Sequence, residues 1–307
     1  MNPKVSCYSL NRYACHKYLI YFICVSGILS SSSSSSLEIQ TEDSSDRRVA
    51  DVNDLDVGTF TSFNIIERNV GIEETTENLI YRAFKICLKS YVRGVDITSR
   101  GIVLVKNCFP ADIVPSEEEI NSALNELWKV QETKKIPRRI IMNESSRHRA
   151  VYQINYKNEK HRELECIFGP MQKTVVETIN GALDLLNKDV FCKTHDLKYH
   201  IRYIKDTRYP SQELISSLGV ADANALTKQG CHIDFPFLTA KGMSCFLSAS
   251  CGTKLEVLQL PEGIKLAGLK ASDLVGHGVK FQSIEYDRCD FLIMRGDWPH
   301  RGTNYTT

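Results

Sequence analysis

At 307 residues the chain is long enough for one large domain or two modest ones, and it can bury a substantial core. Its 38 basic and 37 acidic residues are nearly balanced and form no basic stripe, so the charge pattern gives no support for nucleic-acid binding. The eleven cysteines show neither a Cys-x-x-Cys pair nor zinc-finger spacing, which favours buried or free thiols in a reducing compartment.

The first 36 residues are expected to lie outside the fold. Three basic residues precede an apolar run over 18–29, and unbroken serine follows over 30–36. This order is typical of a secretory signal peptide or membrane anchor, although the run is short for a bilayer span. Two tyrosines inside the run fit an inert leader equally well. The compartment therefore stays open: cytoplasmic if the leader is inert, and the secretory pathway if it is a signal.

Residues 37–70 are acidic and polar, which predicts a disordered linker, and a single domain is expected over 71–307. Apolar residues recur at helical spacing between Ile72 and Tyr91. This spacing predicts a helix that ends by Gly94.

A strand and two further helices are predicted next. Residues 101–109 form an aliphatic, β-branched run that is typical of a strand. Ser116 and Glu119 have the spacing of a capping box, so a helix should begin there. The charge-rich residues 131–165 are expected to form loops, or alternatively a rim that receives an anionic or polar substrate. Another helix is expected over 170–186.

The C-terminal half has the pattern of short strands in series. Alternation predicts a strand over 198–204, and the polar segment 206–229 is expected to be helix or loop. Further strands are predicted at 243–249, 255–260, 280–286 and 291–294. Strands in series with helices only upstream predict an α+β fold, in which a sandwich or barrel carries helices on one side.

Two short pieces of this half carry candidate metal ligands. His232 and Asp234 are two residues apart, so on an extended strand their side chains point the same way. His300 follows the predicted strand 291–294 and its turn. A lone His-x-Asp is common by chance, and its weight here comes from the strand-like flanks and the second histidine. Two histidines and a carboxylate, which leave the other coordination positions of the metal open, are the ligand set of non-haem Fe(II) oxygenases.

The stretch Gly-Asp-Trp-Pro-His-Arg-Gly-Thr-Asn around His300 resembles the distal-histidine turn of the Fe(II)/2-oxoglutarate-dependent dioxygenases. With the His-x-Asp pair, the resemblance covers roughly the last two-thirds of the chain. It implies a double-stranded β-helix (jelly-roll, cupin-like) core with flanking N-terminal helices. It also implies Fe(II) on His232, Asp234 and His300, with 2-oxoglutarate as co-substrate. The implied reaction is hydroxylation of an unidentified substrate with release of succinate and CO2.

The resemblance further implies a basic anchor for 2-oxoglutarate on a closing strand beyond the distal histidine. Only seven residues follow His300. We therefore expect a domain that is incomplete at its C-terminus, with weak or no turnover and retained iron binding; otherwise Arg202 or Lys254 substitutes as anchor. Tyr203 is expected to hydrogen-bond the co-substrate. Arg301 should point away from the metal, because it neighbours the ligand on a strand.

Two other classes stay open. A cupin-type metalloprotein can use the same three ligands without 2-oxoglutarate, and succinate release would distinguish it. A non-catalytic binding protein on the same barrel is the other class, and iron content would test it.

Overall fold

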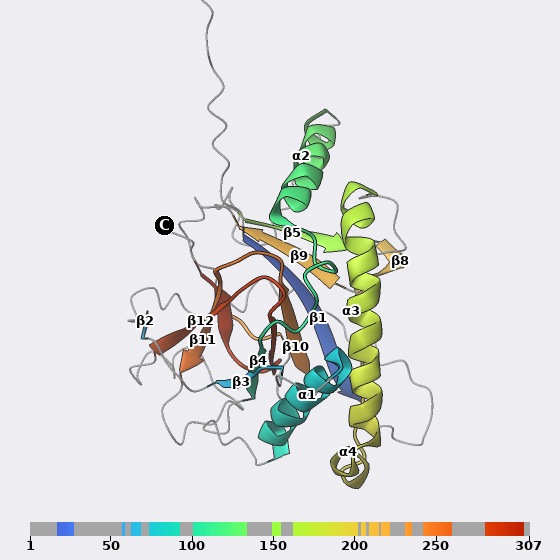
Figure 1. Ribbon diagram of the computed structural model, residues 1–307, viewed down its shortest axis with the longest axis vertical. Helices are drawn as coiled ribbons and strands as arrows, with labels where there is room; N and C mark the ends of the chain where they lie inside the picture. Colours follow the sequence, from blue (N-terminus) through green and yellow to red (C-terminus); the bar gives the residue numbers. More distant parts are fainter. Residues whose placement is uncertain are drawn as a thin grey trace, which may run out of the picture.

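The computed structural model describes residues 17–27, 57–58, 63–68, 74–92, 101–133, 149–154, 162–201, 204–206, 209–214, 216–221, 231–234, 242–259 and 280–303 (Figure 1). Its helices are α1 (Thr76–Val92), α2 (Glu117–Thr133), α3 (Arg162–Lys188) and α4 (Val190–Thr194). Its strands are β1 (Lys17–Gly27), β2 (Val57–Gly58), β3 (Asn64–Ile66), β4 (Ile102–Val105), β5 (Arg149–Ile154), β6 (Lys198–Ile201), β7 (Ile204–Asp206), β8 (Tyr209–Leu214), β9 (Ser216–Ala221), β10 (Met243–Ser248), β11 (Thr253–Gln259), β12 (Lys280–Tyr286), β13 (Phe291–Arg295) and β14 (His300–Gly302).

Two antiparallel sheets form the centre of the fold. The large sheet has the order β3-β4-β13-β10-β1-β9-β5, with β6 also paired to β1. The small sheet has the order β14-β11-β12-β2, and β7 and β8 form a separate pair. Among the described strands, only β3–β4 and β2–β12 pair in parallel. The predicted α+β class is therefore confirmed, and the pairing within its sheets is mainly antiparallel.

Alternation along the large sheet divides the core into two clusters. On β10, Cys245 and Leu247 join the cluster that contains the apolar faces of α1 and α3, whereas Phe246 joins the cluster shared with the small sheet. On β13, Ile293 and Leu292 divide in the same way. Because neighbouring side chains of a strand point to opposite faces, the large sheet lies between a helical layer and the small sheet (Figure 1).

The helical layer forms where the apolar spacing predicts it. The predicted stripes of α1 and α3 are buried against the large sheet. The capping box is also confirmed: Glu119 accepts the Ser116 N–H at 2.7 Å, and Ser116 Oγ accepts the Glu119 N–H at 3.2 Å. The buried stripe residues are Leu79, Ile80, Ala83, Phe84 and Cys87 on α1, and Val175, Ile179, Ala182, Leu183 and Leu186 on α3.

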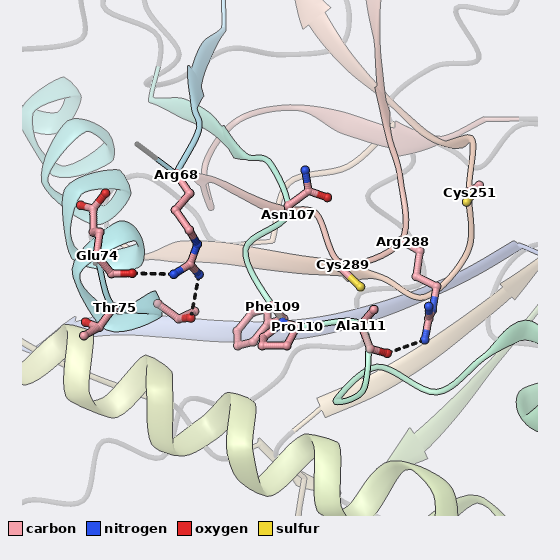
Figure 2. A pocket seen from close by; sticks show the side chains of 11 residues that line it. Arg68, Glu74, Thr75, Asn107, Phe109, Pro110, Ala111, Cys251, Arg288 and Cys289 are labelled. Atoms are coloured by element: carbon pink, nitrogen blue, oxygen red, sulfur yellow. Dashed lines mark hydrogen bonds between the residues drawn. The ribbon is translucent and has the colours of Figure 1, made fainter. Parts of the chain in front are cut away.

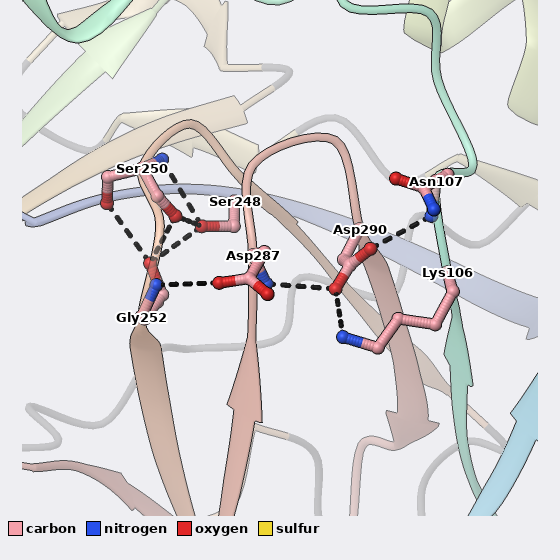
Figure 3. Close-up of polar contacts among 8 residues, drawn as sticks. Lys106, Asn107, Ser248, Ser250, Gly252, Asp287 and Asp290 are labelled. Atoms are coloured by element: carbon pink, nitrogen blue, oxygen red, sulfur yellow. Dashed lines mark hydrogen bonds and ion pairs between the residues drawn. The ribbon is translucent and has the colours of Figure 1, made fainter.

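Asp290 ties together the turns at one end of the two sheets (Figure 3). Its buried carboxylate accepts hydrogen bonds from Lys106 Nζ at 2.6 Å and from the backbone N–H groups of Asn107 and Asp287, each at 2.9 Å. Asp287 in turn accepts the Gly252 N–H at 2.9 Å. One carboxylate thus fixes the end of β4 and, through Asp287, links the β12–β13 turn to the β10–β11 turn.

The N-terminal part of the chain differs from expectation. Residues 1–36 are predicted to lie outside the fold, but β1 pairs with β10 on one side and with β9 and β6 on the other. Residues 37–70 are predicted to be linker, yet they contain β2 and β3. The aromatic and β-branched residues of 18–29 that suggest a targeting segment are also strong strand formers, which accounts for the ambiguity. Within the described residues, no helix combines the length and apolar character needed to cross a membrane.

Strands also occur where loops or helices are expected. The charge-rich region 131–165 contains β5, and the segment 206–229 contains β8 and β9. β5 and β9 pair with each other over six residues, with Ala150 opposite Val220. Pairing between segments about 70 positions apart overrides the local polarity that favours loops. The predicted strand 198–204 is present as β6 and β7, with residues 202–203 outside the described part of the chain.

Candidate metal centre

The three predicted ligands come together in space. One ligand atom from each of His232, Asp234 and His300 lies within 4.8 Å of the other two. His300 Nε2 is 3.6 Å from Asp234 Oδ2, and His232 Nε2 is 3.9 Å from Asp234 Oδ1. Ligand bonds of about 2.1 Å to one shared ion would bring such atoms to about 3 Å from one another. The donor set therefore fits a divalent metal after a small inward movement.

Backbone hydrogen bonds set this geometry. His232 and His300 exchange both of their N–H···O=C hydrogen bonds at 2.9 Å, as directly opposed antiparallel residues do. Their side chains consequently lie on the same face, with ring centroids 4.4 Å apart. Asp234 donates its backbone N–H to the Gly296 carbonyl at 2.9 Å, and this bond fastens the segment 231–234 to the turn after β13.

The orientation of His300 is fixed by its second nitrogen. Nδ1 lies 2.9 Å from the Trp298 carbonyl oxygen, which can only accept, so Nδ1 donates to it and Nε2 is the ring nitrogen left to face a metal. Trp298 is itself held by an indole N–H bond to the Leu258 carbonyl at 3.0 Å. Phe246 approaches the imidazole edge-on at a centroid distance of 5.8 Å. The imidazole of His300 is thus buried and held in the orientation that a metal ligand needs.

Ser244 is a site residue that the sequence alone does not single out. Its hydroxyl, fully buried on β10, donates to Asp234 Oδ2 at 2.6 Å. This bond orients the carboxylate and leaves Oδ1 on the side of His232. The signal in the sequence is a polar residue inside an apolar strand, on the face that also carries Phe246.

The group opens to solvent on one side. The His232 side chain is 35% exposed and that of Asp234 is 11% exposed, whereas that of His300 is only 3% exposed. The solvent-facing side of the group is therefore the side of His232.

Buried side-chain contacts hold the turn between β13 and His300. Arg295 donates through Nε and Nη2 to the two carboxylate oxygens of Asp297, at 2.8 and 2.6 Å, with both side chains 1% exposed. Its guanidinium also covers the Tyr91 ring at 4.3 Å. Gly101 makes this packing possible, since a Cβ there would lie 2.5 Å from Arg295 Cγ. The predicted turn Arg295-Gly296-Asp297 is thus held by a buried bidentate ion pair.

Lys254 is the one proposed 2-oxoglutarate anchor that lies in the described part of the chain. In the small sheet, Val257 lies opposite His300, and Lys254, three residues away, points to the other face. Lys254 lies opposite Glu285 and pairs with it at 3.4 Å. The structure therefore does not bring Lys254 to the ligand group. Arg202 and Tyr203 lie outside the described residues.

The neighbours of Tyr203 on the predicted strand face the helices. Tyr199 and Ile201 of β6 are buried in the cluster that contains α1 and α3. The ligand group lies at the other face of the large sheet, with Ser244 and Phe246. Tyr199 thus occupies an ordinary core position.

Arg301 points away from the metal group, as expected. It pairs through Nε with Glu256 Oε2 at 2.6 Å, and the two side chains are 3% and 4% exposed. Its guanidinium also stacks over Phe281, 3.8 Å from the ring centroid. Because Arg301 follows His300 directly, this pair fastens the three-residue strand β14 to β11.

Neither a comparison with protein-family models nor a search of curated proteins finds a match for the chain.

Proposed function

We propose that the chain is an Fe(II)- and 2-oxoglutarate-dependent oxygenase that hydroxylates an unidentified substrate. The observation that carries this proposal is the convergence of His232, Asp234 and His300, whose ligand atoms lie within 4.8 Å of one another. Two imidazoles and one carboxylate, donated from one side, match the facial triad of non-haem iron enzymes. Zinc sites of the structural kind use four protein ligands instead.

The arrangement of the two sheets supports the same proposal. The ligand group involves β14 of the small sheet, the chain after β13 of the large sheet, and Ser244 of β10. A site between the ends of two facing antiparallel sheets is the arrangement that a double-stranded β-helix provides. We therefore propose this fold for the core.

Each ligand has a distinct task in the proposed reaction. Fe(II) with bound 2-oxoglutarate would supply the oxidising chemistry, with succinate and CO2 as products. Asp234 contributes a hard anionic oxygen, which Ser244 holds in place. His300 presents Nε2 because its Nδ1–H is engaged by the Trp298 carbonyl. His232 lies on the solvent side of the group, so a substrate would reach the group from that side.

A cupin-type metalloprotein that acts without 2-oxoglutarate is the second candidate. The position of Lys254, on the far face of the small sheet, favours it, since that residue cannot grip a co-substrate carboxylate at the ligand group. The three intact ligands speak against a non-catalytic barrel.

The test is an iron-binding titration of the purified chain, followed by a succinate-formation screen with Fe(II), ascorbate and pools of candidate substrates. The proposal expects tight iron binding that His300→Ala abolishes. His195→Ala, at an exposed histidine on the C-cap of α4, serves as the matched control. Iron-dependent oxidation without 2-oxoglutarate would favour the cupin-type alternative. Absence of iron binding would refute both.

A further inference from the structure

A pocket of about 700 Å³ lies at the opposite end of the sheets from the metal group (Figure 2). Its lining includes Cys251, which follows β10, and Cys289, which precedes β13. The metal group lies beside Ser244, near the start of β10, and beyond the end of β13. A five-residue strand and its flanks separate the two sites by roughly 20 Å. The volume is in the range of small-molecule sites.

Two guanidinium groups stand on opposite sides of this pocket (Figure 2). Arg68 donates to the Glu74 carbonyl at 2.5 Å and to Thr76 Oγ1 at 3.3 Å. Arg288 donates to the Ala111 carbonyl at 2.7 Å and also to the carbonyls of residues 114 and 115. Within the described part of the chain, neither guanidinium forms an ion pair with a carboxylate. Neutral carbonyls, and for Arg68 also a hydroxyl, orient the two cations.

The wall between the arginines is apolar and uncharged. Phe109 and Pro110 lie between the two guanidiniums in Figure 2, and Phe109 is fixed by an edge-to-face contact with Phe291 at 5.5 Å. Burial raises the pKa of Cys289, so its thiol stays neutral at pH 7. Glu74 is the sole acid among the lining residues, and its carboxylate is held by Arg82 at 2.9 Å.

From these contacts we infer that the pocket is a second ligand site, which binds a small organic anion with an apolar body. The acidic group of the ligand, a carboxylate or a sulfonate, is placed against the Arg68 guanidinium, where charge-assisted hydrogen bonds are available, and Arg288 borders the other side of the pocket. The apolar body lies on Phe109 and Pro110. This site is separate from the metal group, so the inference does not depend on the proposed oxygenase chemistry.

The test uses the full chain and two fluorescent probes that share an apolar body. The anionic probe is 8-anilinonaphthalene-1-sulfonate, and the neutral control is N-phenyl-1-naphthylamine, which lacks the sulfonate. We expect saturable binding of the anion, weakened roughly tenfold by Arg68→Met through the loss of a charge-assisted hydrogen bond. Arg68→Lys should retain most of the affinity. Lys129→Met, which removes an exposed charge on α2, should change nothing.

A second measurement locates the probe independently of substitution. Among the described cysteines of the sheet ends, Cys251 is exposed, and it lines the pocket. Bound sulfonate should therefore slow the alkylation of Cys251 by iodoacetamide, read by mass spectrometry of its peptide. The inference is overturned if the neutral probe binds as tightly as the anion, or if Arg68→Met binds the anion like the unsubstituted chain. Unprotected Cys251 at saturating probe would overturn it as well.

Discussion

Replacing Glu256 with glutamine should destabilise the protein severely, although the change removes only a charge. Glu256 and Arg301 are 4% and 3% exposed, and their 2.6 Å contact is charge-assisted. Arg301 Nη2 is also buried with no hydrogen-bond partner in the described part of the chain. Removal of one member of a buried pair leaves an uncompensated charge and costs about 3–5 kcal/mol. Glutamine keeps an acceptor for Nε, so we expect a loss of about 3 kcal/mol, at the lower end of that range.

A matched control lies in the same sheet. Lys254 and Glu285 form a cross-strand ion pair at 3.4 Å, with side chains 43% and 60% exposed. Because solvent screens this pair, Glu285→Gln should cost at most about 1 kcal/mol. Free energies of unfolding from equilibrium urea titrations, followed by circular dichroism, measure both variants.

The double variant Glu256→Leu/Arg301→Met separates charge burial from loss of packing. Replacing both members of a buried pair with apolar groups is often neutral or stabilising, so this variant should recover most of the loss. The reasoning is refuted if Glu256→Gln lowers the free energy of unfolding as little as Glu285→Gln does. It would mean that Arg301 has adequate compensation without the carboxylate.

Three further outcomes are expected. Ser244→Ala should weaken iron binding about tenfold in a titration while circular dichroism stays unchanged, because the bond that orients Asp234 is lost. Gly101→Ala should lower the free energy of unfolding in urea by at least about 2 kcal/mol, since the new methyl group overlaps buried side chains. The hydrogen bond from Lys85 lowers the pKa of Asp189 from 3.8 to about 2. The corresponding stability is present above pH 4 and is lost as the pH falls towards 2, so Asp189→Asn should flatten the acid limb of a stability-versus-pH curve.

The sequence predicts the helical layer well, because its signals are local. The apolar spacing of α1 and the capping box at Ser116 depend on residues within one or two turns. The ligands are predictable for a similar reason: the spacing of His232 and Asp234 fixes their common direction on an extended segment. His300 requires only a strand and a turn before it.

Other features depend on pairing between distant segments and leave little local trace. Ser244 becomes a site residue only because β10 lies beside Asp234. The strands β5 and β9 lie in segments that are charge-rich or polar overall, and they pair with each other and, for β9, also with β1. The position of Lys254 could not be predicted for another reason. The alternation of side chains along β11 follows from the sequence, but the register that sets Val257 opposite His300 does not.

The reciprocal bridge between His232 and His300 links occupancy of the site to the stability of the fold. The segment 231–234 is held by that bridge and by the Asp234–Gly296 bond. An ion that needs all three side chains together therefore binds the assembled state and not the unfolded chain. By mass action, a metal at 100 times its dissociation constant stabilises the protein by about 2.7 kcal/mol. The melting temperature should thus rise with metal concentration. At one fixed concentration, a metal of higher affinity should raise it more, so the melting temperatures rank different metals without any knowledge of the substrate.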